Sequence, residues 1–108
     1  MSELSGTERR RAPRARLSLP CTLRRRPSSP IWAETIDLGP AGMSVRATRP
    51  LRPDEIVEFD IARADHEHIA GRARVMRHSG PRAYGLRFEA LPGPMRERLL
   101  ELVHEFAR

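Results

Sequence analysis

The residues best suited to chemistry form an arginine-rich run near the N-terminus, residues 8–14, with the sequence ERRRAPR. A guanidinium group donates two parallel hydrogen bonds to a phosphate, and its flat face stacks on a purine ring. Pro13 stiffens the run and reduces the entropy lost on binding. Such a run is also typical of a solvated tail or of a nonspecific contact with a polyanion. It therefore indicates an anion-binding arm, with a solvated tail as the alternative.

A second candidate is residues 37–42, with the sequence DLGPAG, which follow one expected strand and precede another. An aspartate at the end of a strand can accept hydrogen bonds from the N1 and N2 donors of guanine, a pair that adenine lacks. Gly39 and Gly42 permit a tight turn and a close approach of the backbone to a ligand. The alternative is an ordinary turn in which Asp37 supplies the first hydrogen bond.

The charge of the chain is concentrated where the arginine run lies. All 20 basic residues are arginine, and residues 1–26 hold eight of them against two acids. Residues 27–108 hold twelve arginines and twelve acids, so the formal net charge of +6 belongs to the first quarter of the chain. A domain that binds duplex nucleic acid spreads its charge over several elements. The local charge favours a small anionic ligand instead.

Length and composition restrict the class of protein. The 108 residues suit one domain, and 39% hydrophobic with 31% charged residues is typical of a globular chain. The apolar runs are too short for a membrane span, and no apolar segment follows the basic N-terminus. The single cysteine, Cys21, has no partner for an internal disulfide. We therefore expect a cytoplasmic location and no membrane span.

Six segments are predicted to be β-strands, and in most of them apolar and polar residues alternate with the period of a strand. Turn-forming residues separate them, which predicts a small antiparallel barrel or sandwich. In the first segment Pro20 indicates an edge or a bulge. The fifth is expected to point Ile69, Gly71, Ala73 and Val75 inward. The segments are residues 16–24, 31–38, 43–48, 57–61, 69–78 and 84–88.

The last part of the chain changes to a helical period. Apolar residues recur every three or four positions, which predicts a helix over residues 93–107 with Gly93 as N-cap and Pro94 first in the helix. We expect this stripe to pack on the mouth of the barrel, with a dimer contact as the alternative. The stripe consists of Leu91, Met95, Leu99, Leu102, Val103 and Phe106.

These motifs, in this order, resemble the PilZ domain family of bacterial receptors for the second messenger cyclic di-GMP. Arg10 and Arg14 fit the RxxxR motif of the family, and Arg9 extends it. Asp37 and Gly42 fit the two ends of the [DN]xSxxG motif, and residues 84–88, YGLRF, resemble the last strand. The resemblance covers residues 8–107. It implies a six-stranded antiparallel PilZ-type β-barrel with a C-terminal α-helix.

The resemblance also implies a domain plan and a mechanism. One domain covers residues 9–108, with an arm over 9–16 and a barrel over 17–90. Residues 1–8 are polar without periodicity, so we expect them to form a flexible N-terminus. Arg10 and Arg14 clamp the phosphates and stack on guanine, while Arg9 adds a contact that favours an intercalated ligand dimer. Asp37 reads a guanine edge, and Gly42 lets the backbone turn beneath the ligand. The arm folds over the ligand and signals to a protein partner.

One residue departs from the family pattern, because Gly39 stands where the motif has serine. The loss of one such hydrogen bond costs on the order of 1 kcal/mol, about a five- to tenfold loss of affinity. We therefore expect weakened binding. One alternative is a protein-interaction module of the same fold with weak or no nucleotide binding. A second is a small barrel that binds single-stranded nucleic acid, with Trp32 and Tyr84 as stacking residues, which the balanced charge disfavours.

Other candidates are set aside. His66 and His68 alternate on an extended segment and share a face, but no third metal ligand lies at a recognisable spacing. Cys21 lies on the apolar face of its strand, as a buried structural thiol does. Because no catalytic arrangement of residues is evident, we expect no enzyme activity, no cofactor and no metal. The expected assembly is a monomer or a weak dimer.

Overall fold

The computed structural model describes residues 13–25, 29–63 and 67–107. Within them the chain forms strands and one helix, and no helix there is long and apolar enough to cross a membrane. Arg9 and Arg10 of the expected arm lie outside the described residues. The elements are β1 (Ala15–Arg16), β2 (Pro20–Arg24), β3 (Ile31–Leu38), β4 (Gly42–Ala47), β5 (Ile56–Ala62), β6 (His68–Gly80), β7 (Ala83–Ala90) and α2 (Gly93–Phe106).

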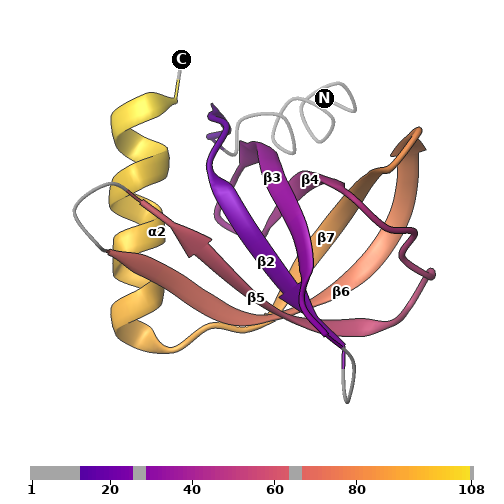
Figure 1. Cartoon of the computed structure of the whole chain (residues 1–108). Coiled ribbons are helices and arrows are strands. Elements are labelled where there is room, and N and C mark those ends of the chain that lie inside the picture. Colours follow the sequence, from indigo (N-terminus) through magenta and orange to yellow (C-terminus); the bar gives the residue numbers. More distant parts are fainter. Residues whose placement is uncertain (1–12, 26–28, 64–66, 108) are drawn as a thin grey trace, which may run out of the picture.

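The strands close into a barrel (Figure 1). Hydrogen-bonded neighbours follow the order β3-β2-β5-β6-β7-β4, and β4 pairs again with β3 to complete the circle. Every pairing is antiparallel. The predicted six-stranded antiparallel barrel with a C-terminal helix is therefore confirmed. Closure leaves no long free edge on which a second chain could pair.

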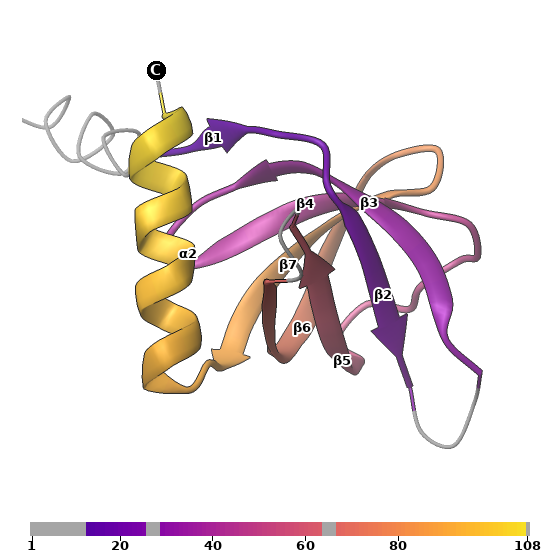
Figure 2. The same cartoon turned by 60° about the vertical axis from the view of Figure 1, so that its left-hand side comes forward.

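The first predicted strand, residues 16–24, is wrong as a single element, because β1 and β2 are separate (Figure 2). Both pair with β3, but the register moves by one residue between Arg16↔Asp37 and Pro20↔Glu34. The hydroxyl of the buried Thr35 spans the break. It accepts a hydrogen bond from Leu19 N at 2.9 Å and donates one to Leu17 O. The Thr35 hydroxyl thus supplements the backbone bonds that remain at the break, Leu17 N to Ile36 O and Thr35 N to Leu19 O.

Replacing Thr35 with valine is expected to lower the free energy of unfolding by about 1–2 kcal/mol, because the change leaves the Leu19 N–H and the Leu17 carbonyl without this partner. Urea denaturation measures the loss. Thr48→Val is the control, since Thr48 is exposed and its hydroxyl donates a single hydrogen bond, to Trp32 O at 3.0 Å. Equal losses in the two variants would contradict a special role for Thr35.

Alternate residues of the strands fill the barrel. In β6, Ile69, Ala73 and Val75 are at most 1% exposed, which confirms these three of the predicted inward residues, while the fourth, Gly71, is half-buried. The neighbouring strands supply similar aliphatic side chains, so the interior is a continuous apolar core rather than a cavity. The largest fully buried side chains of the strands are Leu23, Ile31, Leu38, Met43, Ile61 and Ile69.

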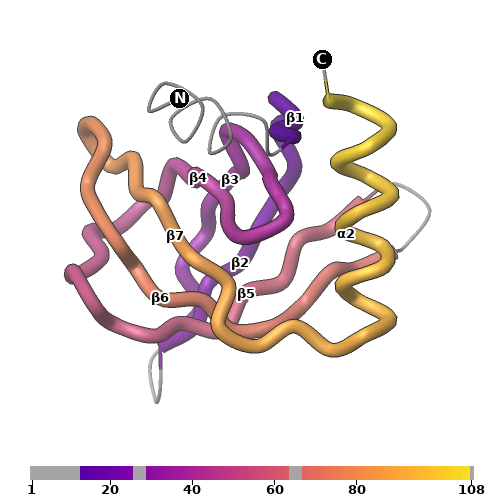
Figure 3. The backbone as a smooth tube through the Cα atoms, turned by 180° about the vertical axis from the view of Figure 1, so that it is seen from behind, coloured from indigo at the N-terminus to yellow at the C-terminus, as the bar shows by residue number. Residues whose placement is uncertain are grey.

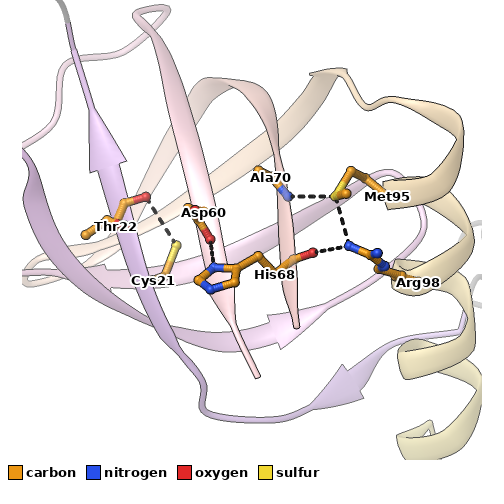
Figure 4. A network of polar contacts seen from close by, with 7 residues as sticks. All are labelled: Cys21, Thr22, Asp60, His68, Ala70, Met95 and Arg98. Atoms are coloured by element: carbon orange, nitrogen blue, oxygen red, sulfur yellow. Dashed lines mark hydrogen bonds and ion pairs between the residues drawn. The ribbon is translucent and has the colours of Figure 1, made fainter. Parts of the chain in front are cut away.

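Helix α2 covers one end of the barrel. Its residues Leu99, Leu102 and Val103 are buried, as predicted, but Phe106 is 40% exposed and lies outside the buried stripe. The N-cap is Pro92 rather than the predicted Gly93. Polar contacts join α2 to β6 (Figure 4): Arg98 donates to the His68 carbonyl at 3.0 Å, and Met95 Sδ accepts from the Ala70 amide at 3.4 Å.

An ion pair ties β2 to the loop before β5. Arg25 binds both carboxylate oxygens of Glu55 at 2.9 Å and also donates to Pro50 O at 3.0 Å. The Arg52 amide donates to Glu55 at 2.8 Å. Burial raises the pKa of Glu55, but the hydrogen bonds and charges of Arg25 and Arg52 outweigh burial and leave that pKa below its ordinary value of 4.5.

The Glu55 ion pair is expected to make stability depend on pH. Because the folded pKa lies below the unfolded value of 4.5, the carboxylate stabilises the fold above that value. The contribution disappears as the pH falls through the folded pKa. Urea denaturation should show wild type about 1 kcal/mol more stable than Glu55→Gln near neutral pH. This difference should shrink below about pH 4.5. Glu105→Gln, at an exposed position of α2, is the control, and a pH-independent difference for Glu55→Gln would contradict the prediction.

Candidate ligand-binding site

The structure brings together two residues that the sequence analysis selected from different motifs. Arg14 immediately precedes β1, and Asp37 lies near the end of β3, opposite Arg16 of β1. The Arg14 guanidinium donates a hydrogen bond to a carboxylate oxygen of Asp37 and forms an ion pair with it. Both side chains keep access to solvent, with 46% of Arg14 and 26% of Asp37 exposed.

A bulge in β3 sets the direction of Asp37. Thr35 pairs with Val45 of β4 and Asp37 with the preceding residue, Ser44, so β3 holds one extra residue, Ile36. An extra residue reverses the alternation of side chains beyond it. Leu38 therefore enters the core, where it is 0% exposed, and Asp37 faces outward toward the arm. Without the bulge, Asp37 would share the inward face of Thr35.

Gly39 is the residue on which the arm rests. It is buried, and a Cβ added to it would lie 2.6 Å from Arg14 Nη1 and 3.3 Å from the Pro13 carbonyl oxygen. Its amide donates to the Gly42 carbonyl at 2.8 Å and so closes the turn between β3 and β4. Among the described glycines only Gly80 has a positive φ. Gly39 does not have a left-handed backbone conformation. Its missing side chain instead lets Arg14 approach closely.

Gly42 has a packing role that its sequence motif does not reveal. It begins β4 and pairs with Arg87 of β7. A Cβ added there would lie 2.3 Å from the backbone oxygen of Leu86. Since real Cβ atoms do not approach an oxygen so closely, β4 and β7 can lie at this spacing only with glycine at position 42.

A shallow concavity of about 420 Å³ lies on the outer surface beside Arg14, formed by β4, the end of β6 and β7. Sequence analysis missed Arg77 and Arg87, which line it with Arg14, because they belong to the part of the chain whose charges balance. For Arg87 the available signal was its outward position in the predicted strand 84–88. Arg77 falls on the predicted inward face of residues 69–78, and only the register shift between Val75 and Arg77 turns it outward. The described residues that line it include no acid, so the surface suits an anion. The others are Ala41, Gly42, Met43, Ser44, Met76, Ser79, Gly85 and Leu86.

Two other concave surfaces, of about 460 and 570 Å³, lie over β2, β5 and β6. There the charges alternate across the strands, because Arg24 and Arg72 are the cross-strand neighbours of Glu58. These surfaces are larger than the concavity beside Arg14, but they contain none of the motif residues. The arginine-lined concavity of β4, β6 and β7 is therefore the candidate site.

The residues set aside from the sequence fall elsewhere. His68 Nδ1 lies 2.6 Å from an Asp60 carboxylate oxygen (Figure 4), and His66 is outside the described residues. Among residues 13–25, 29–63 and 67–107, no three possible metal ligands come together. Cys21 is 2% exposed, and burial raises its pKa to about 12, so the thiol stays protonated at neutral pH. Its predicted role as a buried thiol is confirmed.

The aromatic residues differ from expectation at one position. Tyr84 is 4% exposed and stacks on His78 with ring centroids 4.8 Å apart, so the prediction that it can stack on a base is wrong. Trp32 is 67% exposed, as that hypothesis requires. Among the described residues the other exposed aromatic side chain is Phe106, 40% exposed on α2. Because so few aromatic rings are exposed, the hypothesis of a single-strand nucleic-acid binder is weakened.

Comparisons with known proteins agree with this architecture. The family model described as PilZ domain matches residues 8–105. The PilZ domain of YcgR from Escherichia coli, solved with c-di-GMP, has a TM-score of 0.76 at 14% identity, over 91% of each chain. The PilZ domain of CeSA from a cellulose-synthesizing bacterium has a TM-score of 0.67 at 19% identity, over 85% of this chain and 95% of that one.

A third structure, the Bacillus subtilis inhibitor of motility MotI/DgrA, has a TM-score of 0.74 at 15% identity over 88% of this chain. The chain spans about half of that protein, 49% of its length. No curated protein sequence matches. The similarity to solved structures supports the fold, and the family model covers nearly all of the barrel and the helix. This chain belongs to the PilZ domain family.

Proposed function

We propose that this chain is a receptor for cyclic di-GMP that passes its ligand state to a protein partner. The observation that carries the proposal is the meeting of Arg14 and Asp37 at the edge of an arginine-lined concavity. The family supports it, because PilZ domains are generally receptor or adaptor modules rather than enzymes. The YcgR domain, which has the same fold, was solved with this ligand.

The ligand carries two phosphates and two guanines, and the site has groups for both. Arg14, with Arg9 and Arg10 of the arm, binds the phosphates through charge-assisted hydrogen bonds. Arg77 and Arg87 add positive charge from the barrel side of the concavity. Asp37 accepts from the N1 and N2 donors of a guanine, which gives the site its selectivity over adenine.

The arm has a physical connection to the helix that suits signalling. Ala15, which follows Arg14, is 0% exposed and pairs with Leu38 of β3. It also forms a bridge with Ala107, immediately after α2, and Figure 3 shows β1 beside that end of the helix. A ligand that moves Arg14 therefore also displaces Ala15, which is packed between β3 and the end of α2. The partner reads this change at the arm or at α2.

Titration calorimetry with cyclic di-GMP tests the function directly, with cyclic di-AMP as the control nucleotide. We expect binding of cyclic di-GMP and at least tenfold weaker binding of cyclic di-AMP, because adenine lacks the pair of donors that Asp37 accepts. Absence of heat with cyclic di-GMP would contradict the proposal.

A second function is favoured by Gly39, which offers no hydroxyl where the family motif has serine. In this alternative the chain is a protein-interaction module of the same fold that no longer binds nucleotide. The same titration separates the two functions, since only the receptor releases or absorbs heat with cyclic di-GMP.

A further inference from the structure

Arg14 occupies the space that a side chain at position 39 would need. A Cβ on residue 39 would lie 2.6 Å from Arg14 Nη1 and 3.2 Å from Arg14 Cζ. Both are closer than ordinary van der Waals contact, so Arg14 cannot keep this place beside any residue other than glycine. The two nearest atoms are the far end of a flexible side chain, so a new Cβ displaces the guanidinium first. The Pro13 carbonyl oxygen, at 3.3 Å, has to give way by only a few tenths of an ångström.

The backbone on both sides of this contact is held by the sheet. Ala15 pairs with Leu38, and Arg16 pairs with Asp37. The bulge at Ile36 turns the Asp37 carboxylate outward, toward the guanidinium of Arg14. The two charged groups are thus presented to each other by β1 and β3, and the missing side chain of Gly39 leaves room for the Arg14 guanidinium.

We propose that Gly39 is a positioning residue that lets Arg14 latch the arm to Asp37 before any ligand arrives. The ligand part of this inference rests on the proposed function. Arg14 and Asp37 are both proposed ligand contacts, and each already has the other as its partner. A guanine that binds Asp37 must replace Arg14 there, so the latch competes with the ligand and sets the resting position of the arm.

The latch itself is tested without ligand, by the order of the Arg14 side chain in NMR spectra of the whole chain. The {¹H}–¹⁵N NOE of each arginine Nε is measured, with Arg14→Lys identifying the Arg14 signal. Arg25, held by Glu55, is the ordered reference, and the exposed Arg96 is the mobile one. We expect the NOE of Arg14 in wild type to resemble that of Arg25.

Three variants separate the latch from a general effect of mutation. Gly39→Ala adds only the obstructing Cβ, and Asp37→Ala removes the partner. Both are expected to lower the NOE of Arg14 to the level of Arg96. Gly93→Ala is the matched control, because a Cβ there meets nothing within 4 Å, and it should leave Arg14 unchanged. An Arg14 that is mobile in wild type, or equally ordered in Gly39→Ala, would overturn the inference.

Calorimetry then tests the competition. Gly39→Ala is expected to bind cyclic di-GMP about three- to fivefold more tightly than wild type, because the broken pair is exposed and exposed pairs are weak. Unchanged or weaker affinity in Gly39→Ala would overturn the competition between latch and ligand. If no variant binds cyclic di-GMP, the proposed function fails, and the ligand-free spectra still decide whether the latch exists.

Discussion

Replacing Arg10 and Arg14 together with alanine is expected to lower the affinity for cyclic di-GMP by at least about 100-fold. A hydrogen bond to a charged group contributes about 1.5–3 kcal/mol, so two lost arginines remove about 3–6 kcal/mol. Each 1.4 kcal/mol is tenfold in the dissociation constant, which gives a loss of about 10²- to 10⁴-fold. Calorimetry with cyclic di-GMP measures it.

The control for this variant must remove the same charge elsewhere. Arg46→Ala with Arg96→Ala does so, because both positions are exposed, one on β4 and one on α2. A general attraction between a basic protein and an anion weakens equally in the two double variants. The proposed clamp predicts less than about a threefold change in the control, since only screened long-range attraction is lost there. Equal losses would contradict a specific role for the arm.

Gly42→Ala is expected to destabilise the barrel by about 2–3 kcal/mol. The new Cβ would lie 2.3 Å from the Leu86 backbone oxygen, and a carbonyl within a paired strand cannot rotate away as a side chain can. Forced overpacking typically costs 1–3 kcal/mol. For a domain of about 100 residues, this lowers Tm by about 10–20 °C, measurable by differential scanning calorimetry.

Gly85→Ala is the matched control for Gly42→Ala. Gly85 pairs with Ser44 in the same two strands, but a Cβ there would meet Arg77 Cγ at 3.6 Å, an ordinary contact. We expect a change in Tm below about 5 °C, because alanine also reduces the entropy of the unfolded chain. Similar losses of Tm in both variants would mean that an added methyl group destabilises β4 and β7 wherever it is placed. That result would contradict a specific clash with the Leu86 oxygen.

Much of the fold was predictable because strand identity is a local property. Turn-forming residues flank residues 31–38 in the sequence, and β3 has those bounds. The same holds for the inward residues of β6 and for the buried stripe of α2, where the spacing of apolar residues alone selects the face that avoids water. The split between β1 and β2 was not predictable, because it depends on the Thr35 hydroxyl of another strand.

The candidate site was predictable by residue type but not by arrangement. Arg14 and Asp37 were selected for their chemistry, and the structure places them in contact. Arg77 and Arg87 were missed, since only the pairing of β4, β6 and β7 brings them beside the arm. Tyr84 was expected at the surface and is buried against His78, because the alternation in β7 turns it inward.

By itself, the sequence determined the elements of this protein, its barrel class and the groups capable of binding an anion, because periodicity and residue type act over a few neighbours. Only the tertiary structure decided which of those groups meet. The bulge at Ile36 reverses the face on which Asp37 lies, and the missing side chain of Gly39 admits Arg14. Both effects depend on register and close approach between strands, which closure of the barrel imposes.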